Sequence, residues 1–333
     1  MKRAERRRLE RLARKASPKV EHHINLQNPV GQHFEEYIRA NAAIRKEHGL
    51  PVVRENEAAG QSLVICGAGP SLREHAARTA EGDQVWGCNS AVVWLHEQGY
   101  KVTHGFTVDQ TPEMLNEWAT VPPVDFLLAT SVQPELVKML LGRCRSVAFF
   151  NNYVGIPKEP VLSASGPIEF EEWLYGALFP PTIKTFSGLN AVTRALDLAR
   201  YMGFEKITVL GADCALKVSR VLDPSVPAGS PEHQRWLEDE CVMHADGGNA
   251  LASGATALTL EGEIDGRVWV TKPDMMITAV WMEKMRQEDP ARIEYVGDTL
   301  PNALRDKTDE FLGSLPHFVD HMGNPLHLWD SAA

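Results

Sequence analysis

The sequence predicts an α/β fold, a Rossmann-like doubly wound and mostly parallel sheet with an N-terminal helical extension and a lid-like insertion. From residue 61 onward, short apolar runs alternate with segments of helical periodicity. Runs such as "LVIC" and "FLLA" are continuously apolar, which indicates strands buried on both faces. Alternating strands and helices are typical of a parallel sheet that helices cover on both sides.

Composition places the chain among ordinary globular proteins. It has 333 residues, 44% of them hydrophobic and 23% charged, enough for one large α/β domain with a sizeable core. No apolar run approaches the roughly 20 residues of a membrane helix, and the chain does not open on a signal-peptide pattern. Its five cysteines are scattered without a C-x-x-C pair. We therefore expect buried free thiols and a cytoplasmic protein.

Charge is distributed unevenly along the chain. The net charge of −10 argues against a nucleic-acid coat protein, yet the opening "MKRAERRRLERLARKASPK" is strongly basic. This arm fits RNA, an anionic membrane surface or the acidic face of a partner protein, and it equally fits a solvated, frayed terminal helix. We expect a basic arm over 1–30, a helix and linker over 31–60, a nucleotide-binding domain over 61–305 and a C-terminal tail over 306–333.

The elements follow from the pattern in chain order. Residues 31–48 predict a helix with Phe34, Ile38 and Ala42 on one face, and residues 49–60 a linker. Five strand segments then alternate with four helical ones: strands at 62–69, 84–90, 104–109, 124–131 and 146–152, with helices at 71–80, 91–99, 111–119 and 134–142 between them.

The second half repeats the alternation after an interruption. Residues 154–183 show weak periodicity and predict a loop or small helical insertion, whereas 190–203 predict an amphipathic helix and 206–216 a buried strand. Polar residues 217–256 are expected to form a lid. A hairpin turns at Asp265-Gly266. A helix capped by Asp274 and a last strand at 292–297 complete the domain.

The turn "CGAGPSL" is the first candidate for ligand binding. Gly67 and Gly69 permit a tight turn and close approach of the backbone to a phosphate or ribose, with Ala68 between them. Pro70 suits the first helical turn, and Ser71 can cap that helix. Neither the dinucleotide fingerprint nor the phosphate-gripping G-x-x-x-x-G-K-[ST] loop is present, because Leu72 replaces the third glycine and no such lysine loop exists.

Other polar residues occur where neighbouring strands are expected to end. Since the carboxyl ends of parallel strands meet at one edge, where such sheets bind ligands, we expect these residues to converge. Together with the turn they form the expected nucleotide site, which includes Asn89, Ser90, Asp109, Asn151, Ser187, Gly188 and Asp213. Each also has a structural explanation as a helix cap or strand end.

Several segments resemble one family's motif series. "GAGPSL", "CNSAV", "FTVDQTPEM" and "SGLNAVTRALDLARYMGFEKITVLGADCAL" resemble a bacterial, archaeal and phage family of unknown function. That family includes the motility-associated (Maf) flagellin glycosyltransferases and the archaeal 6-hydroxymethylpterin pyrophosphokinases (MptE-like). The downstream "GEIDGRVWVTKPDMMITAVWMEKM" and "YVGDTLPNAL" resemble the glycosyltransferase type. The series is also similar to bacterial sialyltransferases that use a CMP-sugar, and the resemblance covers roughly residues 60 to 305.

The resemblance implies site residues and exposes departures. Those sialyltransferases use a His about thirty residues beyond the G-x-D strand as general base, which here corresponds to His244, and Asp213 ends that strand. They carry Asn between the two glycines, where this chain has Ala68. In the pterin enzymes, the resembling segment after the third strand has the pattern T-D-L-D-G. This chain has "TVDQT" there, with the single Asp109.

Three functions remain open at this point. The first is a nucleotide-dependent glycosyltransferase that moves a CMP-activated nonulosonic sugar to an acceptor glycan or protein with inversion, with catalytic His244 and Asp213 and no required metal. The second is ATP-dependent pyrophosphoryl transfer to a hydroxymethylpterin, with Mg²⁺ held by Asp109 and Asp213. The third is a non-catalytic Rossmann-like binding or assembly module that docks through its basic arm. The oligomeric state is open.

Overall fold

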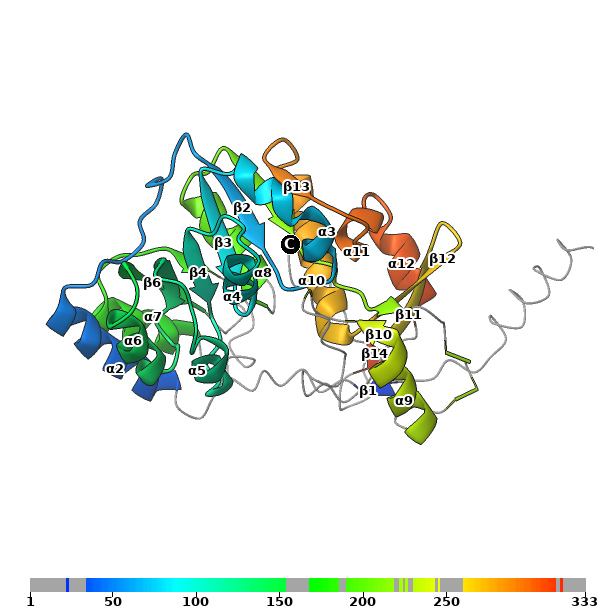
Figure 1. Ribbon diagram of the computed structural model, residues 1–333, viewed down its shortest axis with the longest axis horizontal. Coiled ribbons are helices and arrows are strands. Elements are labelled where there is room, and N and C mark those ends of the chain that lie inside the picture. Colours follow the sequence, from blue (N-terminus) through cyan, green and yellow to red (C-terminus); the bar gives the residue numbers. More distant parts are fainter. Residues whose placement is uncertain are drawn as a thin grey trace, which may run out of the picture.

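An eight-stranded parallel sheet forms the centre of the molecule (Figure 1). The computed structural model describes residues 22–23, 34–153, 168–185, 190–218, 222–223, 225–226, 230–242, 245, 260–315 and 318–319. The strand order is β13-β8-β2-β3-β4-β5-β6-β7, and every pairing in it is parallel. The predicted Rossmann-like α/β class is confirmed.

The strands coincide with the apolar runs of the sequence. They are β2 (Ser62–Cys66), β3 (Gln84–Cys88), β4 (His104–Thr107), β5 (Asp125–Ala129), β6 (Ser146–Asn152), β7 (Lys184–Thr185), β8 (Lys206–Leu210) and β13 (Ile293–Tyr295).

Helices occupy most of the connections. They are α2 (Phe34–His48), α3 (Ser71–His75), the 3₁₀ helix η1 (Ala76–Glu81), α4 (Ala91–Glu97), α5 (Glu113–Glu117), α6 (Pro134–Leu141), α7 (Ile168–Leu178), α8 (Ala191–Tyr201), α9 (Pro231–Glu240), α10 (Pro273–Glu288), α11 (Leu300–Ala303) and α12 (Thr308–Ser314).

The strand order reverses between β2 and β8. From β2 the chain adds β3 to β7 on one side, and it then returns to place β8 and β13 on the other side of β2. In an open α/β sheet, such a reversal leaves a crevice beyond the carboxyl ends of the two strands, because their connecting helices lie on opposite faces. The tips of β2 and β8 are therefore where a ligand site is expected in this fold.

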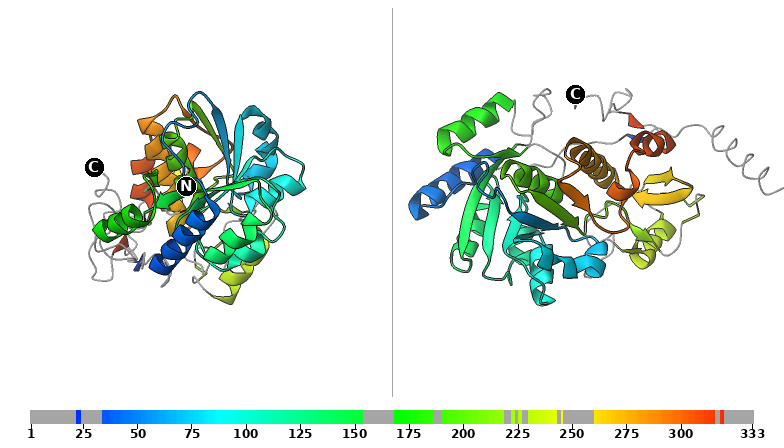
Figure 2. Two further views of the ribbon diagram at one scale, coloured as in Figure 1. Left: turned by 90° about the vertical axis from the view of Figure 1, so that its left-hand side faces the viewer. Right: turned by 90° about the horizontal axis from the view of Figure 1, so that it is seen from above.

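Both faces of the sheet are buried. Along β2, Leu63 and Ile65 belong to the large core that includes α8, whereas Val64 and Cys66 belong to a second cluster with Leu72 of α3. This alternation is the period of two that a pleated strand imposes. Figure 2 shows the corresponding layers, with α8 and α10 on one side of the sheet and α3 and α4 on the other.

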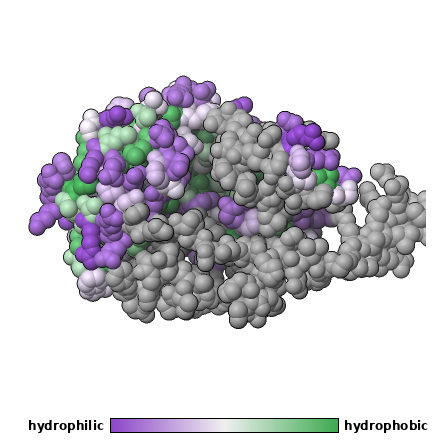
Figure 3. Space-filling view, turned by 90° about the horizontal axis from the view of Figure 1, so that it is seen from below, coloured by the Kyte–Doolittle hydropathy of each residue, from purple (hydrophilic) through white to green (hydrophobic). Residues whose placement is uncertain are grey.

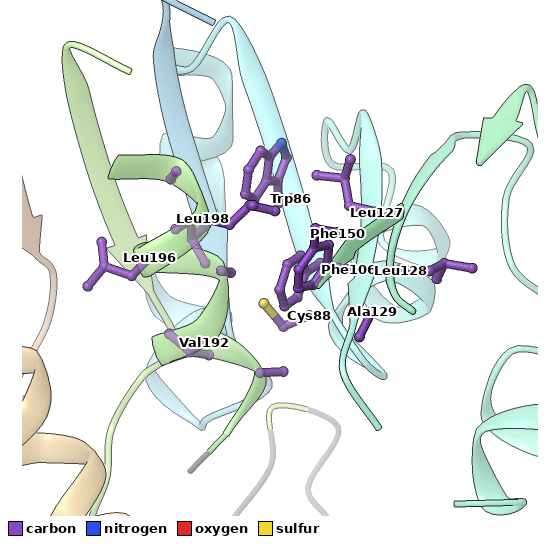
Figure 4. Close-up of a cluster of buried hydrophobic side chains, with 14 of the residues drawn as sticks. Trp86, Cys88, Phe106, Leu127, Leu128, Ala129, Phe150, Val192, Leu196 and Leu198 are labelled. Carbon is purple, nitrogen blue, oxygen red and sulfur yellow. The ribbon is translucent and has the colours of Figure 1, made fainter. Parts of the chain in front are cut away.

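Aromatic side chains fill the core beneath α8. The ring centroids of Trp86 and Phe106 lie 6.0 Å apart, and those of Phe106 and Phe150 lie 5.2 Å apart, both stacked. Figure 4 shows these rings gathered on the face that α8 covers. The Asn190 side chain begins α8 by accepting a hydrogen bond from Thr193 N at 3.0 Å. This rigid layer holds the carboxyl ends of the central strands in place.

A small hairpin lies outside the main sheet. Strands β11 (Leu260–Ile264) and β12 (Arg267–Thr271) pair antiparallel around Asp265 and Gly266, which have φ angles of 51° and 78°, as the sequence predicts for this turn. The fully buried ring of Phe311 from α12 packs against Gly262. The segment expected as a tail thus contributes a packed helix.

Two further strand pairs complete the described elements. Strand β1 (His22–His23) pairs parallel with β14 (Phe318–Val319), and β9 (Lys217–Val218) pairs antiparallel with β10 (Cys241–Val242). The remainder of the basic arm lies outside the described residues, so the interpretations of that arm stay predictions.

The structure corrects two local expectations. Lys272, and not Asp274, occupies the cap position of α10, because Pro273 takes the first helical position and leaves Asp274 in the first turn, where a carboxylate favours the helix dipole. The helix expected over 71–80 divides at His75 into α3 and η1. Of the two alternatives expected for 154–183, a loop or a small helical insertion, the helical one is confirmed by α7.

Three of the described cysteines are buried thiols, and Cys144 is half-buried. Cys66, Cys88 and Cys214 are free and buried, and burial raises the pKa of each, as expected. None of the helices in the described ranges is long and apolar enough to cross a membrane.

Candidate functional site at the strand tips

The turn after β2 interlocks with the turn after β8. Gly67 N donates to Leu210 O at 2.9 Å, and Gly69 N donates to Gly211 O at 2.8 Å. A Cβ on Gly67 would lie 2.5 Å from Gly211 O, and one on Gly69 would overlap the Asp213 carboxylate. Both glycines are therefore required by the approach of one turn to the other, in addition to any approach of a ligand.

Asp213 binds the first residue of α3. Its carboxylate accepts hydrogen bonds from Ser71 N at 3.1 Å and from Ser71 Oγ at 2.9 Å, and the two residues are 7% and 2% exposed. Ser71 therefore does not cap the helix with its own side chain, as the sequence suggested. Pro70 holds the cap position without a side-chain hydrogen bond, and the carboxylate of Asp213 satisfies the helix amide instead.

The occupant of this helix terminus limits what else can bind there. A carboxylate already lies at the amide of Ser71, so a phosphate at the same point would meet a like charge. The structure thus assigns Asp213 and Ser71 to holding the two turns together. Anionic groups of a ligand need another position along the same edge.

Two unpaired carboxamide oxygens lie at the next strand tips. Asn89 Oδ1, after β3, and Gln110 Oε1, after β4, are buried and have no hydrogen-bond partner in the described chain. Asn89 adopts a left-handed φ of 48°, and its carbonyl accepts from Trp118 Nε1 at 3.0 Å. Such oxygens are costly unless something donates to them, and they can accept hydrogen bonds from N–H or O–H groups.

Other predicted residues have local roles or lie farther along the edge. Ser90 precedes α4 without a side-chain cap. Asp109 Oδ1 accepts from Thr111 N at 2.8 Å and so closes its own turn. Asn151 lies within β6 and contacts Thr130 Oγ1 at 3.4 Å. With strands about 5 Å apart, the three strands between β2 and β6 separate Asn151 from Ser71 by ~19 Å.

Asp213 lies too far along the sheet edge to share a metal ion with Asp109. Strands β2 and β3 lie between β8 and β4, which puts the tips carrying Asp213 and Asp109 ~14 Å apart. Within the described ranges, no group of three or more His, Cys, Asp or Glu side chains is gathered around a possible ion position. Two carboxylates on one Mg²⁺ must both lie within about 2.1 Å of it, which this spacing does not offer.

The expected lid reaches the glycine turn. Ala245 N donates to Ala68 O at 2.7 Å, and the Arg73 guanidinium donates to Ala245 O. Ala245 is 3% exposed. His244 next to it, and Ser187 and Gly188 before α8, lie outside the described residues, so their roles stay predictions.

Figure 3 shows polar and apolar side chains intermixed over the coloured part of the face seen from below.

Two buried polar side chains near Asp213, Thr299 and Lys272, are not among the site residues expected from the sequence. Leu300 N donates to Asp213 O at 2.9 Å, and the preceding Thr299 is 2% exposed, with Oγ1 unpaired among the described residues. Thr271 Oγ1 donates to Cys214 O at 2.6 Å, and the following Lys272 is 8% exposed. For Lys272, the available signal in the sequence was its place between a strand and a helix that begins with proline.

The fold and the strand-tip site define a Rossmann-like α/β protein with its candidate site at a topological switch point. The sequence model of a family described as 6-hydroxymethylpterin diphosphokinase MptE-like matches residues 36–219. This match covers more than half of the sequence, and the chain belongs to the MptE-like family.

Among solved structures, a similar fold occurs in the MAf glycosyltransferase from Magnetospirillum magneticum AMB-1. The TM-score is 0.53 at 13% sequence identity, and the likeness covers 87% of this chain and 43% of that one. The present chain thus spans less than half of the length of that protein, and the likeness concerns the fold. Comparison with curated proteins gave no significant match.

Proposed function

We propose that this protein is a nucleotide-dependent transferase that uses a CMP-activated nonulosonic sugar and transfers it to a hydroxyl group of an acceptor glycan or protein. Membership in the MptE-like family and the fold shared with a glycosyltransferase support a transferase-like role. The donor and the acceptor are our proposal, and no metal ion is required in this mechanism.

The unpaired oxygen of Asn89 carries the proposal. It is buried at the tip of β3, one strand from the switch point between β2 and β8. Ribose hydroxyls and the amino group of cytosine are donors, and each can satisfy a carboxamide oxygen. Gln110 offers a second acceptor one strand farther on. The nucleoside thus lies along the tips of β2, β3 and β4, beside the turn formed by Gly67, Ala68 and Gly69.

The chemistry needs one base and a stabilised leaving group. His244 takes the proton of the acceptor hydroxyl as its oxygen bonds to the anomeric carbon of the sugar. The bond from that carbon to the phosphate oxygen breaks, and CMP leaves with the electron pair, so the configuration inverts. Asp213 contributes by fixing the Ser71 turn at the site.

Pyrophosphoryl transfer is the second candidate, since the family's description names a diphosphokinase. It places ATP and Mg²⁺ at the same edge, with Asp109 as one ligand. The separation of Asp109 from Asp213 by two intervening strands weighs against the ion that the two residues would share.

Calorimetric titration of the full chain with CMP, CDP, UMP and ATP tests the proposal. We expect CMP and CDP to bind, and His244→Ala to keep CMP binding while it abolishes transfer from a CMP-activated nonulosonic sugar. Failure of every cytidine nucleotide to bind would overturn the proposed donor. Magnesium-dependent release of AMP from ATP with 6-hydroxymethylpterin would favour the second candidate.

A deletion separates both enzymes from a non-catalytic module. If the chain is an enzyme and its basic arm serves only to bind a partner, removal of residues 1–30 leaves the transferase activity unchanged. Loss of partner capture with no turnover of either donor, before or after the deletion, would identify an assembly module instead.

A further inference from the structure

Buried side-chain atoms without a hydrogen-bond partner gather at the carboxyl edge of the sheet. Among the described residues they include Asn89 Oδ1 after β3, Gln110 Oε1 after β4, and Ser131 Oγ and Gln133 Oε1 after β5. Buried polar atoms are normally paired with the protein, with water or with a ligand, because an unpaired one loses its hydration without compensation. The proposed nucleoside contacts account for Asn89 and Gln110, which leaves the tip of β5 without an assigned partner.

The strand register puts the turn after β5 beside the turn after β4. Thr107 at the end of β4 pairs with Leu128 of β5, and Gln110 and Ser131 each follow three residues after that pair. Neighbouring strands lie about 5 Å apart, so the two turns are adjacent along the edge. The tip of β5 thus continues the row of unpaired atoms on the side away from β2.

A buried asparagine of α2 fixes the backbone around Ser131. Asn41 Nδ2 donates to Thr130 O at 3.0 Å and to Val132 O at 2.7 Å, so the carbonyl groups on both sides of Ser131 are held. Gln133 occupies the cap position of α6 without capping it by its side chain. The polar groups of Ser131 and Gln133 thus take no part in the hydrogen bonds that shape this turn, and they remain available to another molecule.

The polar groups at the tip of β5 are neutral. Residues 130–134 carry no charged side chain. A serine hydroxyl both donates and accepts hydrogen bonds, and a glutamine carboxamide offers one acceptor oxygen and two donor hydrogens. These groups match the hydroxyl and acylamido groups of a sugar, whereas recognition of a phosphate relies on positive charge. Ser131 is 0% exposed and Gln133 is half-buried, so hydrogen bonds made there are sheltered from water.

We propose that Ser131 and Gln133 bind hydroxyl and acylamido groups of the transferred sugar, which lies at the tips of β4 and β5 beyond the nucleoside. This inference rests on the proposed function, and it names the part of the site that distinguishes the sugar nucleotide from CMP alone. The two side chains bind and orient the sugar, and neither takes nor gives a proton in the reaction.

Two ligands isolate the sugar contact in the full-length protein. Calorimetry without an acceptor compares CMP with CMP-N-acetylneuraminic acid in the wild type and in Ser131→Ala, Gln133→Leu and Gln98→Leu. We expect Ser131→Ala and Gln133→Leu each to lower the affinity for the sugar nucleotide about three- to tenfold, through loss of one hydrogen bond, and to keep the affinity for CMP. Gln98→Leu is the matched control, because Gln98 is exposed after α4, and it should behave as the wild type.

The thermal midpoint of the free protein provides an independent readout. Ser131→Ala and Gln133→Leu should unfold at the same temperature as the wild type or higher, because the atoms removed have no partner in the described chain. A lower midpoint together with unchanged ligand affinity would assign the two side chains to internal hydrogen bonds, to the chain or to a buried water, and would overturn the sugar contact.

The two proposals fail in different ways. If both variants bind the sugar nucleotide as the wild type does, or lose CMP affinity equally, the sugar contact is overturned and the proposed function stands. If the wild type binds neither CMP nor the sugar nucleotide, the proposed function falls and this inference falls with it.

Discussion

The carboxylate of Asp213 and the hydroxyl of Ser71 join the tips of β8 and β2 by a hydrogen bond of 2.9 Å between Oδ2 and Oγ. The two residues are 142 positions apart in the chain and meet where the strand order of the sheet reverses. Their contact fills a helix terminus that the sequence suggested for a ligand, so it determines how the site at this edge is organised.

Removal of this contact should destabilise the protein. We expect Asp213→Ala to lower the free energy of unfolding by about 2–3 kcal/mol, because two buried donors of Ser71 lose a charged acceptor. Ser71→Ala should cost about 1.5 kcal/mol, since the amide bond remains. Urea denaturation of the two single variants and the double variant measures the coupling. Additive effects in the double variant would contradict a direct interaction.

Gly69 should not tolerate even a methyl group. A Cβ there would overlap the Asp213 carboxylate and lie 2.6 Å from Gly211 O, so Gly69→Ala should cost about 1–3 kcal/mol through overpacking. Gly176 in α7 is the matched control, because a Cβ there has nothing within 4 Å and alanine favours a helix by ~0.8 kcal/mol. Equal unfolding midpoints for the two variants would refute the close approach of the turns.

Asn89 allows a test that separates binding from backbone conformation. Asn89 and Asn56 both have left-handed φ angles, 48° and 57°, and glycine adopts such angles without strain. Asn89→Gly should leave stability within about 1 kcal/mol and weaken CMP binding about three- to tenfold, through loss of one hydrogen bond. Asn56→Gly, in the linker, should leave CMP affinity unchanged. A similar loss of affinity in both variants would argue against a ligand contact at Asn89.

His104 should make stability depend on acidity. Burial lowers the pKa of His104 to about 4, although Asp125 opposes the shift. Because the folded-state pKa is below the unfolded value of about 6.5, the unfolded chain binds more protons between these values. Stability is therefore lost as the pH falls from about 6.5 to 4, and His104 accounts for about 2 kcal/mol of that loss at pH 5.

The contribution of His104 to this loss of stability is measured by comparing the wild type with a variant that lacks the histidine. Urea unfolding of the wild type and His104→Gln at pH 7 and pH 5 should show a smaller loss of stability in the variant. An equal loss in both proteins would assign the acid sensitivity to other groups.

The sequence predicted the sheet because local patterns report burial directly. Continuous apolar runs such as Leu63–Cys66 require cover on both faces, and the stripe that includes Val192, Ala195 and Leu196 predicts α8. The hairpin turn at Asp265 and Gly266 followed from residues that tolerate positive φ. Each of these features depends on neighbours in the chain.

The strand-tip site was predicted only in outline. That polar residues converge on one edge follows from parallel strands, and Asn89 and Asp213 do lie at that edge. The sequence could not order the strands, so it grouped Asp109 and Asn151 with Ser71 although intervening strands separate them. The burial of Thr299 and Lys272 depends on the tertiary fold, in which the adjacent residues Leu300 and Thr271 are hydrogen-bonded to the loop after β8.

By itself, the sequence determined the α/β class, the positions of most strands and helices, and the glycine turn at Gly67 and Gly69, because these depend on periodicity and backbone freedom within short segments. Only the tertiary structure decided that Asp213 occupies the start of α3, and that the buried oxygen of Asn89 has no hydrogen-bond partner among the described residues. Hydrogen bonds and charge burial at this edge join residues more than a hundred positions apart, and their energies depend on the strand order that the whole chain adopts.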